Sequence, residues 1–369
     1  MEQKKALFLP FMQIPTGHHH VADALIQEMQ QAREDMICDK VDILSYSYGR
    51  MEKVISSAYL TWIRLFPDVY DRIYQHAAYR RSPVGRHYLY ETLFVHFLKR
   101  LANQLHPNIL FCTHALPSNI ASVLKMKEQL QSITVNVYTD YFVNRIWGIE
   151  GIDYHLVPSV MVKEDLLKKG VQEERIFITG IPIHPVFHLG KHSRESSEEI
   201  SILVTGGSLG VGAIEKILAS STSDKIHYFV LCGKNEALYE QLVREKRQSV
   251  TPIPYVTSKG EMNALYDRVD AVVTKPGGVT VSECLMKRKP IFVYNPLPGQ
   301  EKINADNLKQ LGLVTPVELH DNLVEQQIID FFADEKKHEK YNKNVDAYHQ
   351  HLDERSLSIV INQILSQKH

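Results

Sequence analysis

Residues 271–283 read AVVTKPGGVTVSE, which is a short apolar strand, a glycine turn and the start of a helix. A strand that passes through such a turn into a helix is the repeating unit of parallel α/β sheets. Glu283 falls about one turn into the predicted helix, so its carboxylate can reach back over the turn toward a ligand. A carboxylate that accepts two hydrogen bonds suits a ribose diol. For an isolated Glu, however, stabilisation of the helix dipole is the better explanation.

The same pattern follows a second predicted strand. Strand 200–205 leads into TGGSLG, residues 205–210, and then into a helix. Backbone N–H groups of such a loop can close on a diphosphate at a helix N-terminus. A tight connection between strand and helix would explain these glycines equally well.

A third predicted strand, turn and helix start follow the first motif in the sequence. Strand 290–294 is followed by PLPGQEKIN, residues 296–304. This spacing predicts Gln300, Glu301 and Asn304 on one helix-start surface. Their side chains could bind sugar hydroxyls or cap the helix.

Predicted strands and helices alternate in two series, which indicates two Rossmann-like α/β domains. Further strands are expected at 6–9, 37–44, 109–112, 133–138, 155–157 and 228–232. Residues 181–200 interrupt the alternation with two prolines and a run of charges, as an interdomain linker does. The predicted domains are residues 1–184 and 198–345, and residues 346–369 are expected to hold a helix that crosses back to the first domain.

Composition narrows the class of protein. The 369 residues are 44% hydrophobic, which is enough for two cores. Lys and Arg number 42 against 43 Asp and Glu, so no global charge indicates nucleic acid binding. The four cysteines stand far apart without a CxxC pair, which argues against a disulfide scaffold and a zinc site. No stretch approaches the roughly 20 apolar residues of a membrane span, so a reduced, cytoplasmic protein is expected.

Taken together, the three glycine motifs resemble glycosyltransferase family 28. That family includes bacterial processive diacylglycerol glucosyltransferases, plant monogalactosyldiacylglycerol synthases and, more distantly, the transferase that forms lipid II. TKPGGVTVSE at 274–283 and PLPGQEKINA at 296–305 carry the resemblance, which extends over most of the chain. It implies a GT-B fold with a cleft between two Rossmann-like domains, inversion at the anomeric carbon and no required metal or other cofactor. The sequence contains no Asp-X-Asp, which agrees with the last point.

The resemblance also implies a UDP-sugar site in the C-terminal domain. Its residues are Gly206, Gly207, Ser208, Gly210, Tyr255, Val256, Gly277, Gly278, Thr280, Glu283, Gln300 and Glu301. Within this set, the glycine loop is expected to hold the diphosphate and Glu283 the ribose. Tyr255 and Val256 are expected at the uracil, and Gln300 and Glu301 at the donor sugar. An aromatic at a strand end such as Tyr255 is also a common core residue.

The N-terminal domain is expected to bind the acceptor and to supply a base. His18 matches the histidine of the family's N-terminal glycine loop, although Pro15 replaces the first glycine and must change the local backbone. As a general base on the acceptor hydroxyl, His18 would have a pKa near neutrality. Asp140 is a candidate to orient this histidine or to cap a helix. Metal binding by the triplet 18–20 is a weaker hypothesis, because adjacent residues at a helix start point in different directions.

Gly17, His114 and Trp62 complete the predicted acceptor site. Trp62 lies in segment 53–100, where eight basic residues face three acids, a balance of 8 − 3 = +5. Its aromatics recur at intervals of three and four, as on one face of a helix: Tyr59, Trp62, Phe66, Tyr70 and Tyr74. Such an element suits the interface of an anionic membrane, or the core of the N-terminal domain. A peripheral location on the inner face of the cell membrane is therefore expected.

Several alternatives remain open from the sequence. The architecture also suits a non-hydrolysing UDP-sugar epimerase or a non-catalytic UDP-sugar sensor, and the acceptor could be a soluble alcohol or phenol. The residues do not choose among UDP-glucose, UDP-galactose and an amino sugar, and they do not say how many sugars are added. They are also silent on the oligomeric state.

Overall fold

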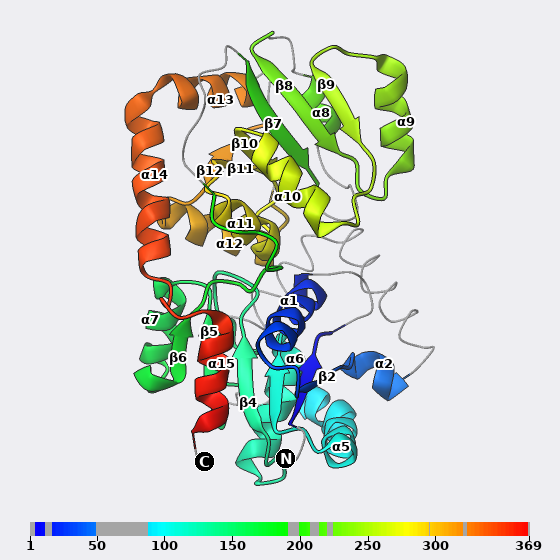
Figure 1. Ribbon diagram of the computed structural model, residues 1–369, viewed down its shortest axis with the longest axis vertical. Helices are drawn as coiled ribbons and strands as arrows, with labels where there is room; N and C mark the ends of the chain where they lie inside the picture. Colours follow the sequence, from blue (N-terminus) through cyan, green and yellow to red (C-terminus); the bar gives the residue numbers. More distant parts are fainter. Residues whose placement is uncertain are drawn as a thin grey trace. The chain divides into compact units, whose positions relative to one another are not determined.

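The structure is a computed structural model that divides the chain into two compact units. Unit 1 is Met1–His184 with His351–His369, and unit 2 is Pro185–Gln350 (Figure 1). The residues described are 4–11, 17–48, 88–190, 199–206, 214–219, 224–294, 296–319 and 323–367. Each unit is built on its own six-stranded sheet, and every strand pair in both sheets is parallel.

The sheet of unit 1 has the order β2-β1-β3-β4-β5-β6. Its strands are β1 Lys5–Leu9, β2 Ile37–Lys40, β3 Ile109–Cys112, β4 Ile133–Val137, β5 Tyr154–Val157 and β6 Ile176–Ile178. The helices are α1 Gly17–Ala32, α2 Ile43–Tyr48, α5 Tyr88–Leu105, α6 Ala115–Met126, α7 Val160–Lys168 and α15 Leu357–Ser366, with a 3-10 turn at Glu173–Arg175. The chain leaves β1 for β2 on one side and returns to β3 on the other. The connections that follow β1 and β3 therefore run in opposite directions along the sheet. Parallel sheets hold their ligands in the space between two such connections.

Continuous apolar strands place the core of unit 1 on both faces of its sheet. β1 and β3 are almost fully buried, and Phe8 stacks on Phe111 with ring centroids 4.8 Å apart. Leu7, Leu9 and Leu110 face the opposite way, into a cluster with residues of α5 and α6. Such unbroken apolar runs are expected for strands covered by helices on both faces.

The C-terminal helix α15 belongs to unit 1. The chain re-enters this unit where the Asp353 N–H donates to the Ile178 carbonyl over 2.7 Å. α15 then packs against α1. It buries Val360, Ile361, Ile364 and Leu365.

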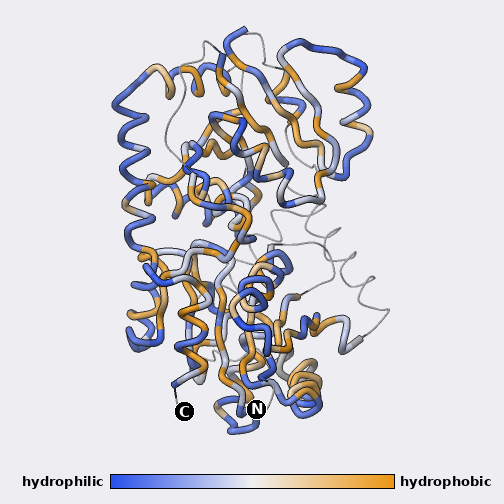
Figure 2. Tube along the Cα trace, in the orientation of Figure 1, coloured by the Kyte–Doolittle hydropathy of each residue, from blue (hydrophilic) through white to orange (hydrophobic). Residues whose placement is uncertain are grey.

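The sheet of unit 2 has the order β12-β11-β10-β7-β8-β9. Its strands are β7 Ile200–Thr205, β8 Ile226–Leu231, β9 Val250–Ile253, β10 Ala271–Thr274, β11 Ile291–Tyr294 and β12 Thr315–Val317. The helices are α8 Ile214–Ala219, α9 Glu236–Glu245, α10 Lys259–Arg268, α11 Gly278–Met286, α12 Gln300–Gln310, α13 Leu323–Ala333 and α14 Glu335–Gln350. Figure 2 shows hydrophobic strands in both sheets, whereas α14 is largely hydrophilic. In this sheet, the connections that run in opposite directions are those that follow β7 and β10.

Two features differ from the sequence expectation. The predicted strand 37–44 ends at Lys40, because the Asp42 carboxylate accepts the N–H groups of Leu44 and Ser45 and starts α2 instead. β6, β9 and β12 have only three or four residues, and prolines interrupt the latter two, which removes the length and alternation that identify a strand.

The boundaries of unit 2 differ from those predicted for the second domain. Unit 2 runs from Pro185 to Gln350, wider than the predicted 198–345. Its C-terminal boundary lies later than predicted because α14 continues without a break to Gln350. Among the described helices, none combines the length and apolar character needed to cross a bilayer.

Candidate active site

The three glycine motifs lie at the ends of three adjacent strands of unit 2. Thr205 pairs with Thr274, and Thr274 pairs with Val293, so β7, β10 and β11 end side by side. The Tyr294 hydroxyl donates to the Thr205 carbonyl over 3.1 Å, which ties the first motif to the third. Motifs that are about 90 residues apart in the chain thereby form one continuous edge.

The turn between β10 and α11 leaves its backbone accessible. Gly277 is the N-cap of α11 and makes no side-chain capping bond. A Cβ at Gly277 would meet no atom within 4 Å, so the space beside this helix start is open. Free N–H groups and the positive end of the helix dipole suit a phosphate here, with Gly278 and Thr280 in the first turn.

Glu283 is buried within a polar network. Its side chain is 8% exposed, and Oε2 accepts a hydrogen bond from the Tyr266 hydroxyl over 2.8 Å. The Lys259 ammonium lies 3.5 Å from Oε1. Burial raises the pKa of the Glu283 carboxyl, and Lys259 and Tyr266 oppose that rise.

The position of Glu283 and its two partners argue against the helix-dipole explanation. α11 begins at Gly278 and has no acid in its first turn, so Glu283 lies too deep in the helix to act mainly on the dipole. Tyr266 and Lys259 hold the carboxyl in place, and each oxygen keeps a further lone pair for a ligand.

The third motif is organised by Glu301. Gly299 has φ +88°, a left-handed conformation that suits glycine, and α12 begins at the next residue, Gln300. Glu301 Oε2 accepts the Leu297 N–H over 2.8 Å and lies 3.8 Å from the Lys275 ammonium. Glu301 therefore stabilises its own loop and joins it to the second motif. Asn304, predicted on the same surface, is instead 2% exposed because it lies on the face of α12 that packs into unit 2.

Tyr255 is available to a ligand rather than part of the core. It follows β9 at the edge of the sheet and is 41% exposed, and the neighbouring Val256 is half-buried. The Lys234 ammonium lies 5.5 Å from the centroid of the Tyr255 ring. Sequence reasoning missed Lys234, although it follows β8 and a glycine, the same position that marks the other motifs.

His18 lies at the corresponding edge of unit 1, in the first turn of α1. Its Nδ1 is 2.8 Å from the Thr113 carbonyl oxygen and 3.0 Å from Thr139 Oγ1. A carbonyl oxygen only accepts, so Nδ1 carries the proton and Nε2 keeps its lone pair. This tautomer has the free nitrogen that a general base requires.

The pKa of His18 differs from the sequence expectation of a value near neutrality. Burial lowers this pKa to about 4, against a smaller rise from the hydrogen bond to Thr113. A neutral imidazole avoids the desolvation penalty of a buried cation. His18 is therefore ready to accept a proton throughout the neutral range.

His114 lies beside His18 in the opposite tautomer. The ring centroids are 4.6 Å apart and the rings are perpendicular, while Phe11 stacks on His114 at 4.7 Å. His114 caps α6, and its Nδ1 accepts the Leu116 N–H over 3.1 Å. Burial holds the pKa of His114 well below its usual value, so the neutral ring must carry its proton on Nε2. Unit 1 thus offers one acceptor nitrogen and one donor nitrogen side by side.

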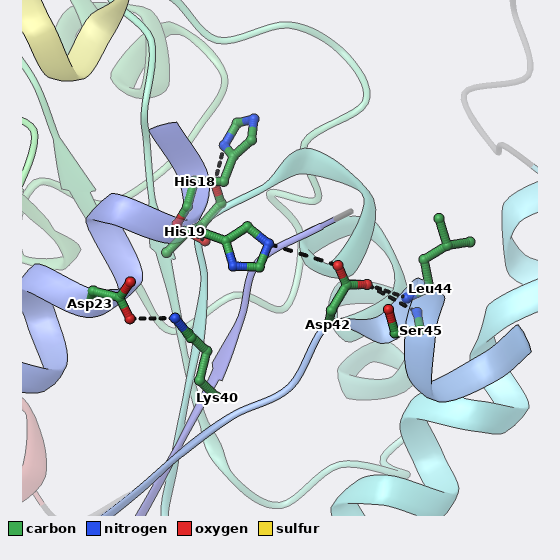
Figure 3. Close-up of polar contacts among 8 residues, drawn as sticks. His18, His19, Asp23, Lys40, Asp42, Leu44 and Ser45 are labelled. Atoms are coloured by element: carbon green, nitrogen blue, oxygen red, sulfur yellow. Dashed lines mark hydrogen bonds and ion pairs between the residues drawn. The ribbon is translucent and has the colours of Figure 1, made fainter. Parts of the chain in front are cut away.

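The other residues predicted around His18 lie as follows. Thr139, the neighbour of the half-buried Asp140, bonds the His18 ring through its hydroxyl group. His19 points away from His18, and its Nε2 lies 3.8 Å from Asp42 Oδ2 (Figure 3). Gly17 is the first residue of α1 and is half-buried. Sequence reasoning missed Thr113 and Thr139, which lie just after β3 and β4, two strands on the same side of β1.

Four predicted site residues lie outside the residues that the structure describes: Gly207, Ser208, Gly210 and Trp62. Gly206 is described, and it is buried directly after β7. Within the described ranges, no group of three or more His, Cys, Asp or Glu side chains is arranged to hold a metal ion.

Comparison with known proteins relates both units to glycosyltransferases. The family model for monogalactosyldiacylglycerol (MGDG) synthase matches residues 18–183, and the model for the glycosyltransferase family 28 C-terminal domain matches residues 201–355. An uncharacterized glycosyltransferase of Bacillus subtilis (strain 168), YkoN, is 41% identical over 98% of this chain and 97% of its own length. The processive diacylglycerol beta-glucosyltransferase of the same strain is 30% identical over 68% of both chains.

Solved structures show the fold. MurG of Acinetobacter baumannii has a TM-score of 0.63 at 13% identity, and the match covers 99% of this chain and 100% of that one. At this identity the likeness concerns architecture alone, and the architecture is GT-B, as the sequence predicts.

We expect His18→Ala to lower kcat by about 10² to 10⁴, the usual effect of losing an acid–base group, with UDP affinity nearly unchanged. If His18 is the base it works unprotonated, so wild-type activity should stay level through neutral pH and fall only as the pH approaches about 4. The mutant should lack this acid limb. Initial rates across a pH series, with calorimetric titration of UDP, measure both effects.

His19→Ala is the matched control, because His19 is the next residue of α1 but pairs with Asp42. Its effect on kcat should be much smaller. Equal damage from both substitutions would show that the histidines hold the loop and that the base lies elsewhere, with Asp140 the next candidate.

We expect Glu283→Ala to weaken UDP binding by about 1.5–3 kcal/mol, as for a lost hydrogen bond to a charged group. Calorimetric titration of the folded variant with UDP measures the change. Glu325→Gln is the control, since Glu325 is also a buried acid of unit 2, at 4% exposure, but lies on α13. Equal UDP affinities in wild type and Glu283→Ala would assign Glu283 to packing alone.

Proposed function

The chain belongs to glycosyltransferase family 28 and is a UDP-sugar-dependent glycosyltransferase, and we propose that it transfers a hexose to a hydroxyl of a lipid acceptor. The acceptor in this proposal is diacylglycerol or a glycosyldiacylglycerol, and the anomeric configuration is inverted. The observation that carries the proposal is the fixed tautomer of His18, which presents an unprotonated Nε2 at the loop edge of unit 1.

Unit 2 binds the donor in this proposal. The first turn of α11, from Gly278, offers N–H groups to the diphosphate, and the open space at Gly277 lets the diphosphate approach. The sequence predicts the same role for the glycine loop that begins at Gly206. Glu283 accepts hydrogen bonds from the ribose diol while Tyr266 and Lys259 hold it. Exposed Tyr255 stacks on the uracil and the backbone of Val256 contacts it.

The donor sugar is bound by Gln300 and Glu301 at the start of α12. Glu301 Oε2 is engaged with Leu297 and Lys275, which leaves Oε1 for a sugar hydroxyl. Gln300 is half-buried at the first position of the helix and offers both a donor and an acceptor group.

Unit 1 activates the acceptor. His18 Nε2 takes the hydroxyl proton as the acceptor oxygen forms a bond to C1 of the sugar, and the bond from C1 to the UDP oxygen breaks. The resulting imidazolium is stabilised by its Nδ1–H bond to the Thr113 carbonyl. The Nε2–H of His114 donates to a neighbouring acceptor oxygen, and Gly17 and Trp62 complete the acceptor site. Asp140 helps to balance the charge that develops on His18.

Lipid as the acceptor class is supported by the relatives. The matching family model is named for monogalactosyldiacylglycerol synthase, and the processive relative is named a diacylglycerol beta-glucosyltransferase. The described part of segment 53–100 includes α5, which carries His96, Lys99 and Arg100 beside one pocket. A basic surface of this kind suits anionic headgroups, so we place the enzyme at the inner face of the cell membrane.

The direct test is mass spectrometry of lipid extracts after incubation with a panel of UDP-sugars and vesicles that contain diacylglycerol. We expect hexosyl-diacylglycerol with one UDP released for each sugar transferred, and no UDP release without vesicles. An isomerised UDP-sugar formed in the absence of lipid, with no net release of UDP, would favour a non-hydrolysing epimerase. A glycosylated soluble alcohol in place of a glycolipid would refute the lipid acceptor.

We further expect turnover to be insensitive to EDTA, because backbone N–H groups and helix N-termini stabilise charge on the departing diphosphate. The measurement is the initial rate with and without chelator on metal-stripped substrate. A loss of activity that magnesium or manganese restores would contradict this mechanism.

A further inference from the structure

A pocket lies at the end of the unit 1 sheet where its strands begin, opposite the end that carries His18. Its walls come from the loop 149–152, which precedes β5, and from residues 169–172 and Arg175, which precede β6. Both segments lie at the amino ends of parallel strands, whereas His18, Thr113 and Thr139 lie at the carboxyl ends. The volume is about 240 Å³. We call it the His155 pocket, after the residue of β5 that lines its interior.

His155 presents an unsatisfied nitrogen. The side chain is 0% exposed, and its Nδ1 is 3.0 Å from the Tyr138 hydroxyl. Nε2, on the other side of the ring, is buried without a hydrogen-bond partner. With Nδ1 turned toward Tyr138, Nε2 is the nitrogen that can face the pocket.

The neighbours of His155 favour one tautomer of the ring. Because the Tyr138 hydroxyl accepts from Asn136 Nδ2 over 3.3 Å, its own hydrogen is available to donate to His155 Nδ1. The neutral ring then carries its proton on Nε2. Burial lowers the pKa of His155 to about 3, with a further decrease from Arg175, so the ring is neutral at physiological pH. A buried N–H without an acceptor is unfavourable, which makes an acceptor in the pocket stabilising.

Two cations line the same pocket. Lys169 and Arg175 are exposed, and within the described residues neither forms an ion pair. Glu150 is the acid of the lining, which leaves a net positive charge. The carbonyl groups at the end of α7 are already engaged, since Leu166 accepts from Lys169 and Val171, and Leu167 accepts from Gly170. The end of the helix therefore offers little competition to an anion.

We propose that the His155 pocket binds a phosphate monoester through the His155 Nε2–H, the Arg175 guanidinium and the Lys169 ammonium. A phosphoryl group accepts hydrogen bonds from several directions, and Arg matches its oxygens in a bidentate manner. The volume accommodates the phosphoryl group and a few further atoms. The ligand is a free phosphate ester or the headgroup of a phospholipid, and the site is separate from the one where sugar transfer takes place.

The test uses the full-length protein and inorganic phosphate as the probe, titrated by calorimetry at constant ionic strength. We expect saturable binding to wild type and an affinity lower by about tenfold or more in Arg175→Gln and in Lys169→Gln, as for a lost charged hydrogen bond. Lys168→Gln is the matched control, because Lys168 is the neighbouring cation but pairs with Asp165 outside this pocket. Its affinity should equal that of wild type.

The His155 ring gives an independent readout that does not depend on a variant folding. Its Nε2–H resonance in the NMR spectrum should move with phosphate and saturate over the same concentration range. Absence of saturable phosphate binding, affinity unchanged in both pocket variants, or a resonance that stays fixed would each overturn the proposal.

Binding to vesicles distinguishes a phospholipid headgroup from a free phosphate ester as the ligand. If the ligand is a headgroup, vesicles of phosphatidylcholine with phosphatidic acid should bind wild type more strongly than Arg175→Gln, and inorganic phosphate should compete. If it is a free ester, glycerol phosphate should bind the pocket and the vesicles should not distinguish the two proteins. Either result supports the site, and all of these binding measurements are independent of sugar transfer.

Discussion

Parallel pairing of strands that are distant in sequence is the constraint on which both units depend. It brings the carboxyl ends of β7, β10 and β11 to one edge of unit 2, and those of β1, β3 and β4 to one edge of unit 1. Every residue of the proposed active site that the structure describes follows a strand at such an edge or lies on the helix after it. Glycine turns are needed there because the backbone must reverse direction and also approach a ligand closely. The sheets therefore supply rigid edges on which short loops carry the chemistry.

Burial sets the electrostatic state of these edges. At the His18 edge, desolvation keeps both imidazoles neutral, and backbone hydrogen bonds select a different tautomer for each. A neutral acceptor and a neutral donor can both contact a hydroxyl without introducing a buried charge before the reaction. At the Glu283 edge, a tyrosine hydroxyl and a lysine oppose the effect of burial on the carboxyl. Fixed dipoles and paired charges of this kind need little reorganisation when charge develops in a reaction.

Burial also determines the state of His155, at the end of the unit 1 sheet where the strands begin. His155 lies on β5 as deeply as the core residues around it, yet one nitrogen has no partner. A polar group in that position is unfavourable unless something in the pocket accepts its hydrogen. Lys169 and Arg175, which form no ion pair with the residues that the structure describes, line the same pocket and favour an anion as the acceptor. In the two proposals, the two ends of the strands of one sheet bind different ligands, an uncharged hydroxyl at one end and a phosphate at the other.

The sequence by itself determined the alternation of strands and helices, the parallel α/β class and the loops that carry polar chemistry. These features are local, since strand, glycine turn and helix start are read within about ten residues, as in 274–283. Only the tertiary structure decided which groups meet. The partners of His18 are 95 and 121 residues away in the chain, at Thr113 and Thr139, and nothing in the local pattern predicts them. The same holds for the low pKa of His18, the burial of Asn304 and the unsatisfied nitrogen of His155, because desolvation depends on neighbours that strand order brings together.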